Sequence, residues 1–203
     1  MRLAVLTGDI VKSGALDASA LDEVMHTLQT ASDQIATWDP TFATFARRGG
    51  DGWQLAMGQP ARVLRAALYL QASLRRMNKT YATRIAVAVG RGTFPDIDAP
   101  DPNAGHGRAF TMSGRLLEQL GGARLMAHAR GGAQHAALTL ADHIAQGWTQ
   151  AQARAVVEML PPDAGPRLEA AKRLNITRQA VDQALWAAGF PALETAITAW
   201  ETI

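Results

Sequence analysis

The sequence contains no cysteine among its 203 residues, which excludes disulfide bonds and metal sites built on thiolates. It also has no apolar run long enough to span a membrane. Its first residues, Met1-Arg2 followed by a short strand pattern, lack the layout of a signal peptide. Together these absences favour a cytoplasmic protein with no membrane partner.

A strong net charge is missing as well, since the formal net charge is only +2 at pH 7. Bulk electrostatics therefore do not indicate nucleic acid binding, and any such function must rest on a local patch. Hydrophobic residues make up 48% of the chain and charged residues 19%, as is typical of a globular rather than a disordered protein. The length allows one large or two small domains.

Two aspartates stand out because each follows a glycine at the end of a predicted strand. Asp9 ends the apolar run 3–8, and Asp51 lies in a Gly-Gly-Asp-Gly turn between the alternating segments 42–47 and 53–57. That turn predicts a β-hairpin, and its glycines let a bulky anion or a metal come close. If the first strand pairs with the hairpin, both carboxylates meet at one sheet edge. There they could hold Mg²⁺ or Mn²⁺ together with a nucleoside triphosphate.

Each aspartate also has a purely structural interpretation, as a turn residue or a helix cap. The segment after Asp9 contains Lys12 and Ser13, both compatible with phosphate oxygens, although a solvated lysine is the simpler interpretation. Trp53 follows the turn and could stack on a base. A tryptophan in the core is the interpretation that we favour.

The first 132 residues show the element order β-α-β-β-α-β-α-β, which predicts an α+β domain. We expect a ferredoxin-like antiparallel sheet with helices on one face, in which the first strand lies beside the hairpin. Beyond the first strand and the hairpin, the patterns predict helices over 17–38, 60–77 and 107–120, and strands over 84–90 and 124–129.

The remainder, 133–203, is predicted to be an all-α domain that begins with a connector helix over 134–146. A short helix over 167–174, a three-residue turn and a helix opened by a Thr177 cap follow the helix-turn-helix arrangement. Segment 167–178 holds four basic residues and one acidic residue, so positive charge is concentrated where such a motif would dock. The residues expected to contact double-stranded DNA are Arg173, Thr177, Arg178, Gln179, Asp182 and Gln183.

So few phosphate contacts predict weak DNA binding by one domain, and therefore a homodimer. A helical bundle used for protein contacts is the alternative to the helix-turn-helix.

Taken together, residues 1 to about 129 resemble the catalytic domain of class III nucleotidyl cyclases. The whole chain resembles the SatD-type family, in which such a domain precedes a helix-turn-helix. The resemblance is carried by Gly8-Asp9-Ile10, Gly50-Asp51-Gly52, the strand 84–90 and the segment 107–116. It implies that Asp9 and Asp51 hold two metal ions with help from the Ile10 carbonyl. It also implies that Arg115 stabilises the polyphosphate in the transition state across a head-to-tail dimer.

The chain departs from the cyclase pattern where the base would be recognised. The asparagine before the catalytic arginine is replaced by Thr111, the purine-reading position by Arg47, and its partner aspartate by Ala104. The residues that would bind the nucleotide are then Lys12, Ser13, Arg47 and Gly50.

This pattern suits a domain that binds a nucleotide without cyclising it, or one that acts on an unfamiliar nucleotide. The first hypothesis is accordingly a DNA-binding regulator with a cyclase-like domain that binds a metal–nucleotide or dimerises. The alternatives are an active nucleotidyl cyclase, or a related metal-dependent phosphoryl transferase, with a helical recruitment domain, and a purely structural dimer.

Overall fold

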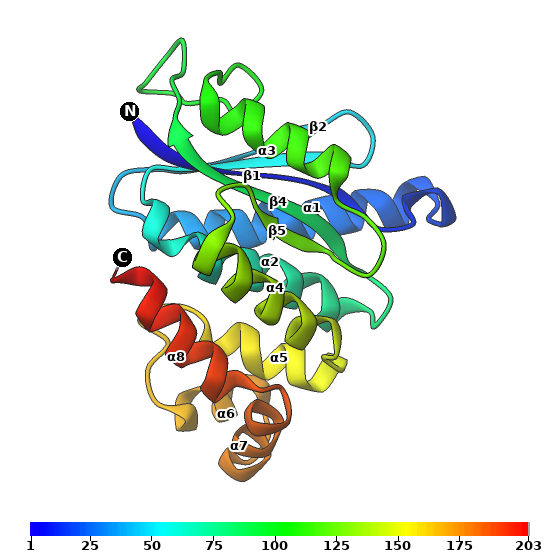
Figure 1. Cartoon of the computed structure of the whole chain (residues 1–203). Coiled ribbons are helices and arrows are strands. Elements are labelled where there is room, and N and C mark those ends of the chain that lie inside the picture. Colours follow the sequence, from blue (N-terminus) through cyan, green and yellow to red (C-terminus); the bar gives the residue numbers. More distant parts are fainter. Residues whose placement is uncertain (203) are drawn as a thin grey trace.

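The computed structural model describes residues 1–202 as an α+β protein, in which a five-stranded sheet packs against helices (Figure 1). β1 lies at the centre of the sheet, antiparallel to β3 on one side and to β4 on the other. The β2–β3 hairpin therefore lies beside the first strand, as expected. The spatial order is β2-β3-β1-β4-β5, and the strands are β1 (Arg2–Ile10), β2 (Ala43–Arg48), β3 (Gly52–Met57), β4 (Thr83–Arg91) and β5 (Met126–His128).

The last strand corrects the expectation of a wholly antiparallel sheet, because β5 runs parallel to β4. The connection between them contains the helix α3 (Arg108–Gln119). Such a crossover returns the chain to the starting end of the sheet, so that the next strand runs in the same direction. The carboxyl ends of β4 and β5 consequently lie at the same edge.

Helices α1 (Ala18–Ala36) and α2 (Val63–Met77) cover one face of the sheet. Their buried side chains form one apolar cluster with alternate residues of β1, including Ala4 and Leu6. The helical period of the sequence placed both helices correctly. Asp17 caps α1, since its carboxylate accepts a hydrogen bond of 2.8 Å from the backbone N–H of Ala20.

Helix α3 lies on the opposite face, which corrects the expectation that all helices share one face. It packs against the other set of β1 residues, including Leu3 and Val5, and the hydroxyl of its Ser113 is 2.8 Å from that of Thr7 in a buried contact. β3 and β4 are parallel to each other, so β3-α2-β4 and β4-α3-β5 cross the sheet in the same sense. With their helices on opposite faces the two connections have opposite hands, and one must be the rare left-handed form. As a result, α3 covers the face that carries Asp9.

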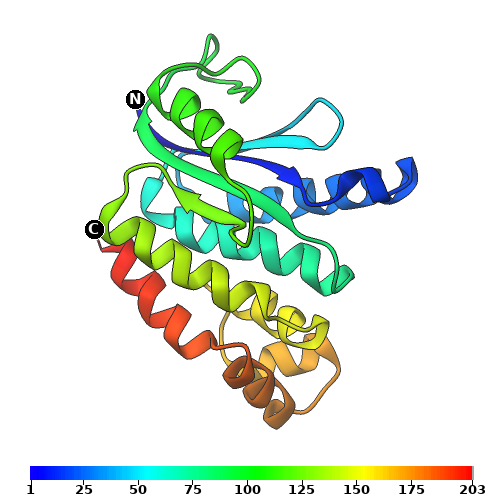
Figure 2. The same ribbon diagram turned by 45° about the vertical axis from the view of Figure 1, so that its right-hand side comes forward.

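The last part of the described chain is helical, with α4 and α8 side by side below the sheet (Figure 2). α8 begins directly after Gly189, which takes a positive φ of 69°, and Pro191 lies in the first turn of the helix. α5 begins with a capping box formed by Thr149 and Gln152. These helices are α4 (Gly132–Gln146), α5 (Gln150–Met159), α6 (Arg167–Leu174), α7 (Arg178–Ala187) and α8 (Phe190–Glu201).

The buried apolar residues continue from the sheet through α2 and α5 to α8 without a break. Arg65 of α2 joins these layers, since it donates to both carboxylate oxygens of Glu201 at 2.6 and 2.9 Å and to the Leu160 carbonyl at 2.5 Å. The expected boundary after residue 132 falls in the first turn of α4, and buried apolar residues on both sides of it belong to one core. The expected second part ends at residue 203, which lies outside the described residues. No helix within residues 1–202 has the length and apolar character needed to cross a bilayer.

Candidate functional site

The ends of β1 and β3 bring the two predicted aspartates together. Asp9 pairs with Gly52 across the sheet, and the Ile10 N–H donates to the Asp51 carbonyl at 3.1 Å. Both aspartates line a pocket of about 460 Å³ between this sheet edge and α3. The hairpin register thus places the backbones of Asp9 and Asp51 side by side, as the sequence predicted. The Ile10 side chain is buried in the core, so only its backbone lies at this edge.

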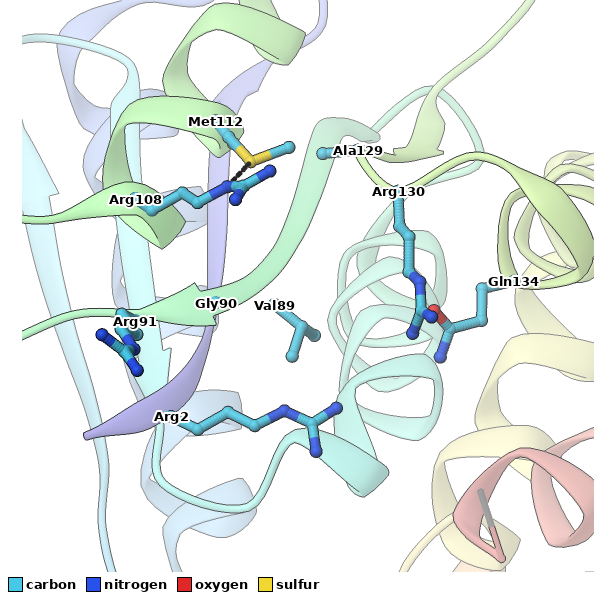
Figure 3. Close-up of a pocket in the computed structure, with 9 residues that line it drawn as sticks. All are labelled: Arg2, Val89, Gly90, Arg91, Arg108, Met112, Ala129, Arg130 and Gln134. Atoms are coloured by element: carbon cyan, nitrogen blue, oxygen red, sulfur yellow. Dashed lines mark hydrogen bonds between the residues drawn. The ribbon is translucent and has the colours of Figure 1, made fainter.

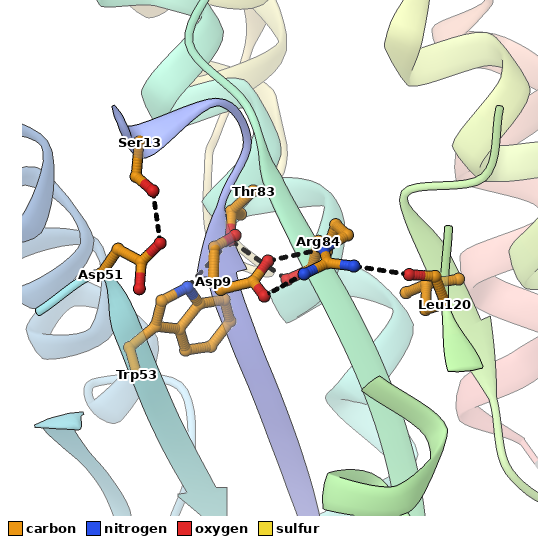
Figure 4. Close-up of polar contacts among 7 residues, drawn as sticks. All are labelled: Asp9, Ser13, Asp51, Trp53, Thr83, Arg84 and Leu120. Carbon is orange, nitrogen blue, oxygen red and sulfur yellow. Dashed lines mark hydrogen bonds and ion pairs between the residues drawn. The ribbon is translucent and has the colours of Figure 1, made fainter. Parts of the chain in front are cut away.

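The carboxylate of Asp9 is held by Arg84 on the neighbouring strand β4. The Arg84 Nε donates to Asp9 Oδ1 at 2.7 Å, the Nη2 donates to Oδ2, and the Nη1 donates to the Leu120 carbonyl at 2.7 Å (Figure 4). The hydrogen bond to Asp9 raises the pKa of Arg84 above its ordinary value, although burial acts in the opposite direction. Sequence reasoning did not assign Arg84 to the site. The strand register could have identified it, because Asp9 and Arg84 are direct partners across β1 and β4.

The carboxylate of Asp51 has a different partner, Ser13, whose hydroxyl donates to Asp51 Oδ2. Lys12 takes a left-handed backbone conformation (φ 55°) at the start of a short 3₁₀ turn over Ser13–Ala15. Figure 4 shows the Asp51 side chain directed to Ser13 and the Asp9 side chain directed to Arg84. The two acidic groups are therefore neighbours along the edge, but each is already engaged by another residue.

Trp53 forms the support beneath this edge and is fully buried, which confirms that it belongs to the core. Its indole N–H donates to the Thr83 hydroxyl at 2.8 Å. Gly8 lies directly against the ring, since a Cβ at position 8 would come within 2.3 Å of Trp53 Cζ2 and 2.4 Å of the Arg84 carbonyl oxygen. The glycine before Asp9 is thus required for close packing of the tryptophan.

The donors at this edge can be compared with the two metal ions that the cyclase resemblance implies. Both oxygens of Asp9 accept hydrogen bonds from Arg84, so a metal there would have to displace a guanidinium group. Within residues 1–202 no three His, Asp or Glu side chains are grouped to share an ion. The arrangement does not fit a two-metal centre, and we derive no catalytic step through one.

Neither of the two residues predicted to act from α3 lines this pocket. Arg115 and Thr111 are exposed, and the Thr111 hydroxyl donates to the Gly107 carbonyl within its own helix at 3.2 Å. The part of α3 that lines the pocket consists of Gly114, Leu117 and Glu118. Within one protomer, the structure does not bring Arg115 to the aspartates.

The predicted base-reading residue, Arg47, lies on the side of the hairpin that faces α1. The Arg47 Nη1 donates to Asp22 of α1 at 2.6 Å, and its Nε donates to the Gly50 carbonyl at 2.9 Å. Gly50 itself is exposed at the turn. Arg47 is therefore held by its own hairpin and by α1, outside the pocket that Asp9 and Asp51 line.

The residues predicted to contact DNA lie on or beside α7. Arg178, Gln179 and Gln183 are exposed, whereas Thr177 caps the helix by accepting a hydrogen bond of 3.1 Å from the Ala180 N–H. The remaining two residues form ion pairs. Asp182 lies 2.8 Å from Arg167 and 3.7 Å from Arg178, and Arg173 lies 2.5 Å from Glu158.

A comparison with protein-family models finds no match for this chain, and a comparison with curated proteins also finds none.

Proposed function

We propose that the protein is a DNA-binding, transcription-regulatory protein that contacts double-stranded DNA through α7. In this proposal the sheet domain is a ferredoxin-like, cyclase-like unit that binds a nucleotide and forms a homodimer. The single observation that carries the proposal is the geometry of α6, its turn and α7.

α6 and α7 are joined by only three residues, Asn175, Ile176 and Thr177. Asn175 takes a left-handed conformation (φ 53°), and the Ile176 N–H donates to the Ala171 carbonyl at 3.0 Å. These two features end α6 sharply, and the Thr177 cap starts α7 at once. A short helix, a tight turn and a second helix supported from behind by α5 are the features of a helix-turn-helix.

The exposed amides of Gln179 and Gln183 lie four residues apart, on the same side of α7. An amide side chain can donate to and accept from one adenine edge in the major groove, so these two residues are assigned to base reading. Arg178 is assigned to a phosphate, because its ion pair with Asp182 is long at 3.7 Å and exposed pairs contribute little energy. To contact a phosphate, Arg173 would have to break its ion pair with Glu158.

The strand order supports a cyclase-like sheet domain, because β2-β3-β1-β4 is the ferredoxin-like order. The pocket beside Asp9 and Asp51 is assigned to the nucleotide. Any Mg²⁺ or Mn²⁺ that accompanies the nucleotide is assigned to Asp51, whose Oδ1 accepts no hydrogen bond from residues 1–202. The pairing of Asp9 with Arg84 and the outward position of Arg115 favour a binding domain over a cyclase.

The test is salt-dependent binding to a random pool of DNA duplexes, measured by fluorescence anisotropy. We expect affinity to fall steeply with salt and to be lost when Arg178 and Gln179 are both replaced by alanine. The matched control replaces Arg124 and Gln119, which are exposed outside α6 and α7, and should keep wild-type affinity. Binding that is absent at low salt, or equal in the two double variants, would refute the proposal.

The nucleotide part is tested separately by calorimetric titration of nucleoside triphosphates with Mg²⁺ or Mn²⁺, on wild type and Asp51→Ala. We expect binding that the substitution weakens, without conversion of the nucleotide. Turnover would instead select a nucleotidyl cyclase or a related phosphoryl transferase. Binding that is indifferent to Asp51→Ala would remove this assignment and leave the DNA assignment intact.

A further inference from the structure

A second pocket, of about 630 Å³, lies at the opposite end of the sheet from Asp9. Arg2 and Asp9 are at the two ends of β1, and at ~3.3 Å per residue their backbones are about 23 Å apart. The pocket is bounded by the carboxyl ends of the parallel strands β4 and β5 and by the first turns of α3 and α4. Its lining residues are Arg2, Val89, Gly90, Arg91, Arg108, Met112, Ala129, Arg130 and Gln134.

Four of the nine lining residues are arginines, and none is acidic. Figure 3 shows Arg2, Arg108 and Arg130 around Val89 from three sides, while the guanidinium of Arg91 is directed away from it. Among residues 1–202, none of the four forms an ion pair, and the only side-chain hydrogen bond of Arg108 is to the Met112 sulfur at 3.2 Å. Like charges gathered without a counterion repel each other, so a bound anion would relieve the repulsion.

The backbone around the pocket also favours negative charge. α3 starts after Gly107 (φ 115°) and α4 starts after Gly131 (φ 73°), and neither start has a side-chain cap or an acidic residue in its first turn. Their free N–H groups and helix dipoles add positive potential to that of the arginines. A Cβ on Gly107 would lie 2.9 Å from the Arg91 carbonyl oxygen, so glycine is needed to bring α3 this close to the end of β4.

A smaller pocket of about 270 Å³ continues from the first, and the two share Arg2, Val89, Arg130 and Gln134. Its other walls are less charged and include Pro60, Ala61 and the edge of Trp200. The combined space has an arginine-rich part and a less charged extension. Guanidinium groups match phosphate because their planar N–H groups donate in pairs to its oxygens.

We propose that this arginine pocket binds a small organic molecule that carries at least two phosphate groups. The phosphates bind Arg2, Arg108 and Arg130, and the organic part extends toward Val89 and Trp200. The site needs no divalent metal, because its positive charge comes from the protein. It is separate from the nucleotide site assigned to Asp9 and Asp51.

The experiment is calorimetric titration of tripolyphosphate and of ATP, both in EDTA and at low salt. We expect both to bind the wild type, with ATP bound at least as tightly because it also fills the extension. The double variant Arg108→Ala, Arg130→Ala should bind each ligand at least about tenfold more weakly. EDTA removes the divalent metal that the nucleotide assignment at Asp51 involves, so failure here is distinguishable from failure of that assignment.

The matched control replaces Arg124 and Arg154, two exposed arginines that line neither pocket, and removes the same charge. Equal weakening in both double variants would show a bulk charge effect and overturn the proposal. So would ATP binding more weakly than tripolyphosphate, or no binding of either ligand to the wild type. Competition by duplex DNA that also depends on Arg108 and Arg130 would identify a nucleic acid surface instead.

Discussion

Where β1 ends, the carboxylate of Asp9 accepts two hydrogen bonds from Arg84, whereas where β1 begins, Arg2 and Arg130 contact no carboxylate of residues 1–202. The first end is stabilised by pairing and by the buried Trp53. The second end is an open pocket in which positive charge is left uncompensated. Charge that is matched inside the protein contributes to the fold, and charge that is unmatched around a cavity is available to a ligand.

The largest effect should come from removing the packing beneath the first end. Trp53→Ala deletes a fully buried ring and its hydrogen bond to Thr83, and we expect a loss of about 3–5 kcal/mol in the free energy of unfolding. Trp186→Ala is the matched control, because that ring is 70% exposed and its loss should change stability by less than about 0.5 kcal/mol. Urea denaturation measures both. Similar losses in the free energy of unfolding for the two variants would show that the buried Trp53 does not stabilise this end of the sheet.

The elements themselves were largely predictable, because they depend on local patterns. The period of the buried residues located α1 and α2, and the Gly-Gly-Asp-Gly turn located the hairpin that places Asp51 near Asp9. The partners of these aspartates were not predictable in the same way. Arg84 is 75 residues from Asp9 in the chain, and only the antiparallel register of β4 brings the two together.

The arginine pocket was still harder to foresee. Its four arginines come from the start of β1, the end of β4, the start of α3 and the turn after β5, so their spacing in the sequence carries no pattern. Their convergence depends on β5 lying parallel to β4 and on α3 crossing the other face, which are the two features that the sequence analysis placed wrongly. When the members of a charge cluster are distant in the sequence and meet only in the folded chain, a search for sequence motifs cannot find the cluster.

Acidification should have an intermediate effect on stability, through His128. This residue lies at the second end, two residues before Arg130 of the arginine pocket. Burial, and then the charges of His135 and Arg130, lower the pKa of His128 to about 4. Between about pH 6.5 and 4 the unfolded chain therefore binds a proton at His128, whereas the folded chain does not. The free energy of unfolding should fall by about 2–3 kcal/mol as the pH is lowered through this window.

Thermal or urea unfolding between pH 7 and pH 4 measures this loss. His128→Leu should flatten the pH dependence by that amount, and His106→Leu, at an exposed position, should leave it unchanged. An unaltered slope in His128→Leu would show that other groups cause the acid sensitivity.

The smallest effect on stability is expected when one arginine from each end of β1 is replaced. Arg84→Ala leaves the Asp9 carboxylate, whose side chain is 19% exposed, without its bidentate partner and removes the bond to the Leu120 carbonyl. We expect a loss of about 1–2 kcal/mol, because the pair is only partly shielded from water. Arg91→Ala removes a charge that forms no ion pair within residues 1–202, and it should change stability by less than about 0.5 kcal/mol. Added salt should narrow the difference, since screening weakens both the pairing at Asp9 and the repulsion around the pocket. Equal losses in the two variants, measured by urea denaturation at low salt, would mean that both ends use their arginines for stability and would remove the contrast between them.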